Sequence, residues 1–149
     1  ADALEEMKSD LVSLFAHERF AAAGTISDER LRAVRASGVL RTLQSQRPRP
    51  DQPYQTMQLA QFNWFLDRGL MSFDAEGRLE IHSERYAETV AALLTEVLAL
   101  QRRGDPGAAA AFFARWTAWS EERHAALARR ILEAEGPRFK LVSYAALGD

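Results

Sequence analysis

The chain has 149 residues, of which 47% are hydrophobic and 27% charged, so residues 1–149 are expected to form a single domain with a hydrophobic core. Its formal net charge of −2 provides no basic surface for nucleic acid or an anionic membrane, and the longest apolar runs are too short to span a bilayer, so neither partner is expected. The absence of cysteine excludes a disulfide scaffold, a thiolate metal site and a cysteine nucleophile, and because it fits a reducing compartment we expect a cytoplasmic protein.

Apolar residues at helical spacing predict that the chain begins with a helix. The apolar stripe of this helix consists of Leu4, Met7, Leu11, Leu14 and Phe15. The pattern stops at residues 21–24, where Gly24 supplies a C-terminal cap.

A second helix is expected to follow at once. Ser27 is a candidate N-cap, and Asp28 and Glu29 suit the positive end of a helix dipole. Its buried face is expected at Leu31, Val34, Val39 and Leu40. Gly38 lowers the helix propensity of this stretch, so the sequence alone leaves open whether the helix is unbroken.

Three prolines between residues 47 and 53 exclude helix interior, because each removes a backbone donor and restricts the residue before it. An exposed, stiff loop is expected there. A third helix, residues 54–68, then ends at Gly69 and includes Trp64. Its other apolar positions are Met57, Leu59, Phe62, Phe65 and Leu66.

Residues 70–81 alternate apolar and polar side chains around a glycine-containing turn at 74–77, which predicts a small β-hairpin. A long helix is expected over residues 83–104, and Asp105 with Pro106 begins the next one. That helix carries a core stripe of Phe112, Phe113, Trp116 and Trp119.

Ser120 and Glu121 are placed to start a final helix that reaches Glu135, and Gly136–Pro137 would end it. Residues 138–144 are expected to form an extended tail that packs back onto the domain. The sequence therefore predicts a mainly α, multi-helical fold with one small β-hairpin.

The three histidines offer no complete metal motif. His17, His82 and His124 include no i, i+4 pair of the kind that zinc-protease helices carry. Glu121 and His124 have the i, i+3 spacing of carboxylate-bridged di-iron bundles, but such sites need two of these pairs and two further glutamates. We therefore expect this pair to lie on a solvated helix face.

The first helix carries an acidic cluster, Glu5, Glu6 and Asp10, and Ser13 and His17 continue its polar face. Glu6 and Asp10 lie one turn apart, so they share a side of the helix. Acids in a first turn also interact favourably with the helix dipole. The residue pattern alone leaves open whether the cluster is a functional site or only compensates that dipole.

The segment Leu4-Glu5-Glu6-Met7-Lys8-Ser9-Asp10-Leu11-Val12 resembles the second metal-binding segment of the dipeptidyl peptidase III family of zinc peptidases, which reads E-E-x-[KR]-[AS]-[DE]. The similarity continues in order through residues 61–69, the hairpin and residues 98–105. The resemblance therefore covers most of the chain.

This resemblance implies that Glu6 is a zinc ligand, and that Glu5 and Asp10 accept hydrogen bonds from the ligating histidines and orient them. Such roles agree with a catalytic zinc that takes three protein ligands and water, with carboxylates fixing its imidazoles. The family's H-E-x-x-G-H helix, which supplies both histidines and the catalytic glutamate, is absent from these residues and would lie upstream of Ala1. We therefore expect a C-terminal fragment that is inactive and holds little or no zinc by itself, and whose partner is the missing N-terminal part.

The family places a histidine that contacts substrate shortly before the helix at 61–69, and this position falls on Tyr54. Tyrosine can donate a hydrogen bond but cannot carry a positive charge. Two hypotheses stay open: a peptide-cleaving parent protein that uses Glu6 and Tyr54, or a non-catalytic regulatory or interaction domain appended to a nudix hydrolase. In either case, apolar surface normally covered by the missing part would favour self-association into a homo-oligomer.

Overall fold

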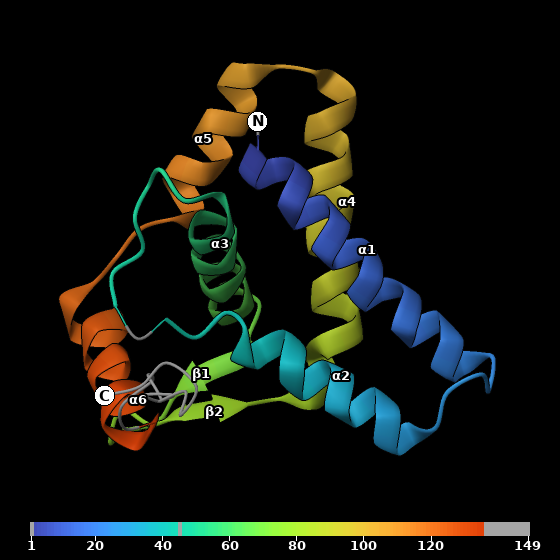
Figure 1. The fold of residues 1–149 in the computed structure, drawn as a ribbon, viewed down its shortest axis with the longest axis horizontal. Coiled ribbons are helices and arrows are strands. Elements are labelled where there is room, and N and C mark those ends of the chain that lie inside the picture. The colour runs from blue at the N-terminus through green and yellow to red at the C-terminus, as the bar shows by residue number, and fades with distance from the viewer. Residues whose placement is uncertain (1, 45, 136–149) are drawn as a thin grey trace, which may run out of the picture.

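The computed structural model describes residues 2–44 and 46–135, and this part of the chain is built from helices with one antiparallel two-stranded sheet (Figure 1). The predicted mainly α fold with one small hairpin is confirmed. No helix in the described ranges combines the length and the apolar character needed to cross a membrane. The elements are α1 (Asp2–Ala22), α2 (Asp28–Leu40), α3 (Pro53–Asp67), β1 (Met71–Phe73), β2 (Leu79–Ile81), a 3₁₀ turn η1 (Ser83–Arg85), α4 (Tyr86–Arg103), α5 (Pro106–Trp116), a π-helical turn η2 (Glu121–Ala125) and α6 (Ala126–Glu135).

The helices begin and end where local capping chemistry predicts. The Ser27 hydroxyl accepts a hydrogen bond from the Arg30 backbone N–H at 3.2 Å, and the Asp105 carboxylate accepts one from the Gly107 N–H at 2.8 Å. Gly104 ends α4 with a left-handed φ of 63°. These caps confirm the starts predicted for α2 and α5 and the end predicted for α4.

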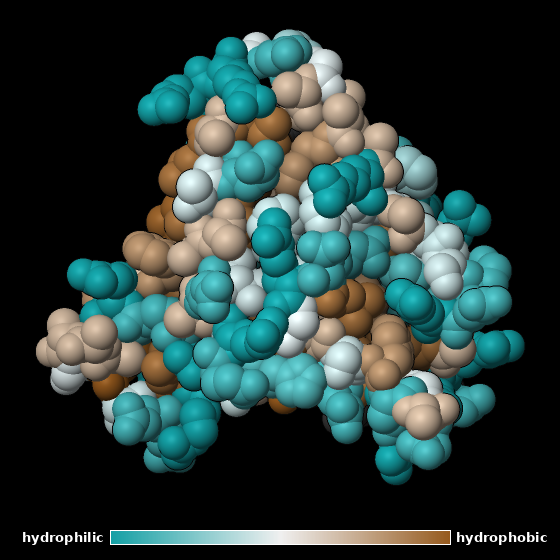
Figure 2. All heavy atoms as spheres, turned by 180° about the vertical axis from the view of Figure 1, so that it is seen from behind, coloured by the Kyte–Doolittle hydropathy of each residue, from teal (hydrophilic) through white to brown (hydrophobic). Residues whose placement is uncertain are grey.

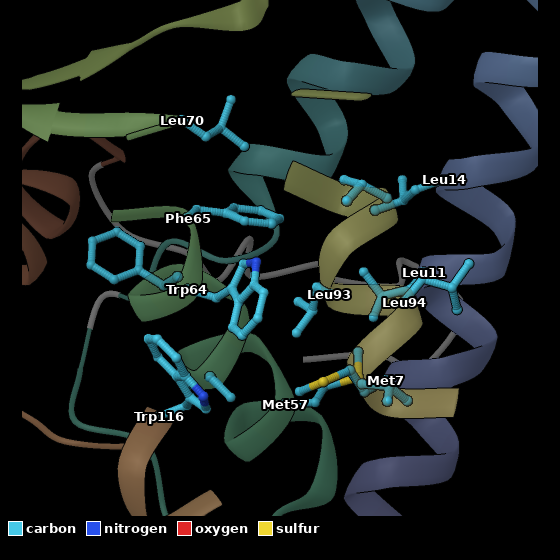
Figure 3. Close-up of a cluster of buried hydrophobic side chains, with 14 of the residues drawn as sticks. Met7, Leu11, Leu14, Met57, Trp64, Phe65, Leu70, Leu93, Leu94 and Trp116 are labelled. Carbon is cyan, nitrogen blue, oxygen red and sulfur yellow. The ribbon is translucent and has the colours of Figure 1, made fainter. Parts of the chain in front are cut away.

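The core lies between α1, α3 and α4, and α3 also packs against α5 (Figure 3). Trp64 of α3 meets Trp116 of α5 edge to face, with ring centroids 4.9 Å apart. The buried stripe of α1 is narrower than expected, because Phe15 is 38% exposed at its edge. The labelled core side chains are Met7, Leu11, Leu14, Met57, Trp64, Phe65, Leu70, Leu93, Leu94 and Trp116.

Helix α2 runs unbroken through Gly38, which answers the question that the sequence left open. The glycine instead allows the ring of Tyr86 to lie directly against α2: a Cβ at position 38 would be 1.9 Å from the Tyr86 hydroxyl oxygen. Val39 is buried beside it, whereas Leu40 is 63% exposed and does not belong to the buried face. The close packing of Tyr86 on α2 therefore explains why a glycine, which is unfavourable inside a helix, occupies position 38.

The hairpin pairs Met71 with Ile81 and Phe73 with Leu79. Beyond it, α5 ends at Trp116 rather than continuing to Trp119, and the chain restarts at Ser120, whose hydroxyl accepts from the Arg123 N–H at 3.2 Å. The terminator expected at residues 136–137 and the tail expected at 138–144 lie outside the described residues. Seen from behind, hydrophilic side chains cover much of the molecule and hydrophobic ones surface between them in patches (Figure 2).

Candidate functional site

The predicted site residues lie on the N-terminal half of α1, where α3 and α4 pack against it. Glu5 is exposed and joins α1 to α4. One of its carboxylate oxygens accepts a hydrogen bond from the Lys8 ammonium at 2.6 Å, and the other accepts one from the Gln101 side-chain amide at 2.5 Å. Glu5 is thus a surface link between two helices.

Asp10 lies deeper, and its side chain is only 8% exposed. The guanidinium of Arg41, at the C-terminal cap of α2, donates to both Asp10 oxygens, with one nitrogen 2.9 Å from Oδ2. The buried Gln61 of α3 donates to the same Oδ2 at 2.8 Å. Asp10 therefore ties three helices together, and a bidentate guanidinium fixes the orientation of its carboxylate.

Glu6 differs from both neighbours because it makes no ion pair with any described residue. Its neighbour is Tyr54, in the first turn of α3 and 58% exposed. The nearby Glu6 carboxylate, through its capacity to accept a hydrogen bond and its negative charge, raises the pKa of the Tyr54 hydroxyl above its usual value. The fold therefore brings together the two residues that the sequence analysis placed at the centre of the site.

The described residues do not form a complete metal site. Among residues 2–44 and 46–135, no three histidine or acidic side chains are grouped so that they could hold a metal ion. A catalytic zinc takes three protein ligands and a water molecule. Glu6 fits the part of one carboxylate ligand, and the other two ligands would have to come from elsewhere.

His124 is a buried structural residue, so the solvated face expected for it is wrong. Its Nδ1 accepts a hydrogen bond from the Ser120 N–H at 2.9 Å, which leaves Nε2 to donate to Asn63 Oδ1 at 2.7 Å. The Asn63 amide donates in turn to the carbonyls of Trp116 and Ala118. This network attaches the connection between α5 and α6 to α3, and burial lowers the pKa of His124.

No family model and no curated protein sequence matches the chain. Two solved structures do: dipeptidyl-peptidase III from Corallococcus sp. strain EGB, with a TM-score of 0.69 at 24% identity, and the same enzyme from Caldithrix abyssi, with a TM-score of 0.70 at 21% identity. Each match covers 89% of this chain. The chain has the fold of part of dipeptidyl-peptidase III. It spans about a quarter of the length of either enzyme, 24% of the first and 25% of the second.

The resemblance to dipeptidyl-peptidase III inferred from four sequence segments is thus confirmed at the level of the fold. The structure also shows that two of these segments, residues 61–69 and 98–105, each contact residues 4–12. Gln61 of the second segment binds Asp10 of the first, and Gln101 of the fourth binds Glu5. Residues that are far apart in the sequence therefore converge on the acidic face of α1.

Proposed function

We propose that this chain forms part of a dipeptidyl-peptidase III-like zinc peptidase, in which it supplies Glu6 as the third zinc ligand and one wall of the peptide cleft. The observation that carries the proposal is the state of the acidic cluster. Glu5 and Asp10 are held by amide, ammonium and guanidinium groups, while Glu6 lacks an ion pair within the described ranges and lies near Tyr54. A carboxylate held on a rigid helix without a cationic partner suits a metal ligand.

Zinc, when bound, supplies a Lewis acid and an activated water. The chain's own contribution includes Tyr54, whose hydroxyl is protonated at neutral pH like that of any tyrosine with an ordinary or raised pKa. This hydroxyl can donate a hydrogen bond to a peptide carbonyl. Tyr54 provides a neutral donor where the resembled family has a histidine, so it stabilises developing negative charge less than an imidazolium would.

Asp10 is also suited to orient a histidine ligand. A carboxylate oxygen has two lone pairs, and its Oδ1 accepts from Arg41 alone within the described residues, so one acceptor position remains. The three-helix tie restricts the motion of this acceptor, as partners of metal-bound imidazoles require. Glu5 would have the same role only after it gives up its contact with Lys8 or Gln101.

The test uses the longest natural polypeptide that contains this chain, with Glu6 intact or changed to Gln. We expect stoichiometric zinc and release of dipeptides from a peptide substrate by the unchanged protein, and loss of both in Glu6→Gln. Glu88→Gln, which removes an exposed acid of α4, serves as the matched control. Equal zinc content in Glu6→Gln and the unchanged protein would refute the ligand assignment.

A non-catalytic helical domain appended to a nudix hydrolase is the second candidate. The tyrosine at position 54, where the resembled family has a histidine, favours it. The two candidates differ in the upstream sequence, because only the peptidase requires a helix with two histidine ligands there. Zinc-free natural protein with an intact nudix domain would support this second candidate.

A further inference from the structure

A groove of about 370 Å³ lies between α1 and α2, beyond the site formed by Glu6 and Tyr54. This volume lies within the roughly 300–1,000 Å³ typical of ligand sites. Leu14 and Val34 provide its apolar surface, and Ser13, His17 and Ser37 line it with polar groups. The groove continues the face of α1 that carries Glu6 and Asp10, because these positions recur at helical spacing.

Arginines lie at both ends of the groove, and no acidic side chain lines it. Arg30 and Arg41 are separated by roughly 16 Å along the axis of α2 at about 1.5 Å per residue. Arg41 is neutralised by Asp10, and it marks the end nearer to Glu6. The Arg30 guanidinium makes no hydrogen bond or ion pair with residues 2–44 or 46–135, so its donors are free to bind a ligand at the far end.

Further hydrogen-bonding groups lie between the two arginines. His17 Nδ1 is 2.7 Å from the carbonyl oxygen of Ser13, which leaves Nε2 for another partner. The hydroxyls of Ser13 and Ser37 make no hydrogen bond with a described residue. Such groups suit the amides and carbonyls of an extended chain, which advances about 3.3 Å per residue, so roughly five residues would span the groove.

We propose that this groove binds the C-terminal end of a peptide and that Arg30 pairs with its terminal carboxylate. The carboxylate preference rests on the groove itself: a free guanidinium forms bidentate hydrogen bonds with a planar carboxylate, and the surrounding lining carries no competing acid. The choice of a peptide as occupant rests on the proposed function. A peptide whose N-terminal part lies at Glu6 would extend past Arg41 and end at Arg30.

The test measures fluorescence anisotropy of an N-terminally labelled peptide, Ala-Leu-Ala-Ala-Leu, titrated with the 149-residue chain in a chelator that removes metal. The same peptide with an amidated C-terminus shows what the carboxylate contributes. Arg30→Gln removes the proposed partner, and Arg32→Gln is the matched control, because Arg32 is on the same helix but outside this groove. Both side chains are exposed, so neither change should unfold the chain.

We expect the free carboxylate to bind roughly tenfold more tightly than the amide, a preference that Arg30→Gln abolishes and Arg32→Gln retains. Equal affinity for the two peptides would overturn the proposal, as would equal losses in the two variants. Binding of inorganic phosphate without any binding of the peptide would identify a general oxyanion site and also overturn it. This titration contains no metal and compares two peptides that differ only at the C-terminus, so its failure can be told apart from failure of the zinc measurement.

Discussion

Replacing Gly38 by alanine tests how α2 packs on the core. The new Cβ would lie 1.9 Å from the hydroxyl oxygen and 3.1 Å from Cζ of Tyr86, and the tyrosine is only 1% exposed and cannot turn into solvent. Overpacking costs about 1–3 kcal/mol, and this overlap belongs at the upper end. Alanine has a higher helix propensity than glycine, which offsets about 1 kcal/mol of this cost. We therefore expect a net loss of about 2 kcal/mol, which for a chain of this length lowers Tm by roughly 4–8 °C.

Thermal unfolding followed by circular dichroism measures this loss. Tyr86→Phe removes the hydroxyl oxygen, which is buried without a hydrogen-bond partner among the described residues, so this change alone should be nearly neutral and should restore more than half of the stability lost in Gly38→Ala. Ala36→Gly, at an exposed position of the same helix, reports the propensity contribution by itself. A Gly38→Ala variant as stable as the unchanged chain, or one that Tyr86→Phe fails to rescue, would refute the packing described above.

Three further predictions concern charged and titrating groups. Burial lowers the pKa of His124, so below about pH 6.5 the unfolded chain binds a proton that the folded chain resists. The free energy of unfolding, measured by urea titration, should therefore decrease as the pH is lowered through this range. The decrease should be less steep in His124→Gln. Asp10→Asn weakens the ion pair with Arg41 and should destabilise the chain by about 1–3 kcal/mol, because the partial exposure of the guanidinium limits the loss. An unchanged midpoint of urea unfolding would show that this ion pair does not stabilise the fold. Glu6→Gln removes the negative charge that helps to raise the pKa of Tyr54, so ultraviolet titration of the phenol should show this pKa falling toward 10.0. An unchanged pKa would show that Glu6 does not act on Tyr54.

The starts of α2 and α5 and the end of α4 were predictable from sequence because capping is local. Ser27, Gly104 and Asp105 act on residues within one turn, so their chemistry is visible in a short window of sequence. The hairpin was predictable for the same reason, since its alternation and its turn are adjacent. The role of Gly38 inside α2 was not predictable, because the glycine makes room for the ring of Tyr86, which is distant in the sequence.

The candidate site was predictable only in part. The resemblance selected Glu6 and Tyr54, and the fold brings them together. The tie at Asp10 could not be foreseen, because its partners Arg41 and Gln61 are 31 and 51 residues away and nothing in the sequence around Asp10 indicates them. The burial of His124 depends equally on Asn63, which lies 61 residues earlier in the chain. Long-range hydrogen bonds of this kind require the packed arrangement of the helices.

The most direct test of the central claim is a crystal structure of the longest natural polypeptide that contains this chain, with diffraction data collected at the zinc absorption edge. The proposal predicts an anomalous peak about 2.0–2.2 Å from a carboxylate oxygen of Glu6, with two histidines from another part of the polypeptide completing the ligand set. A zinc-loaded protein whose peak lies away from Glu6 would contradict it.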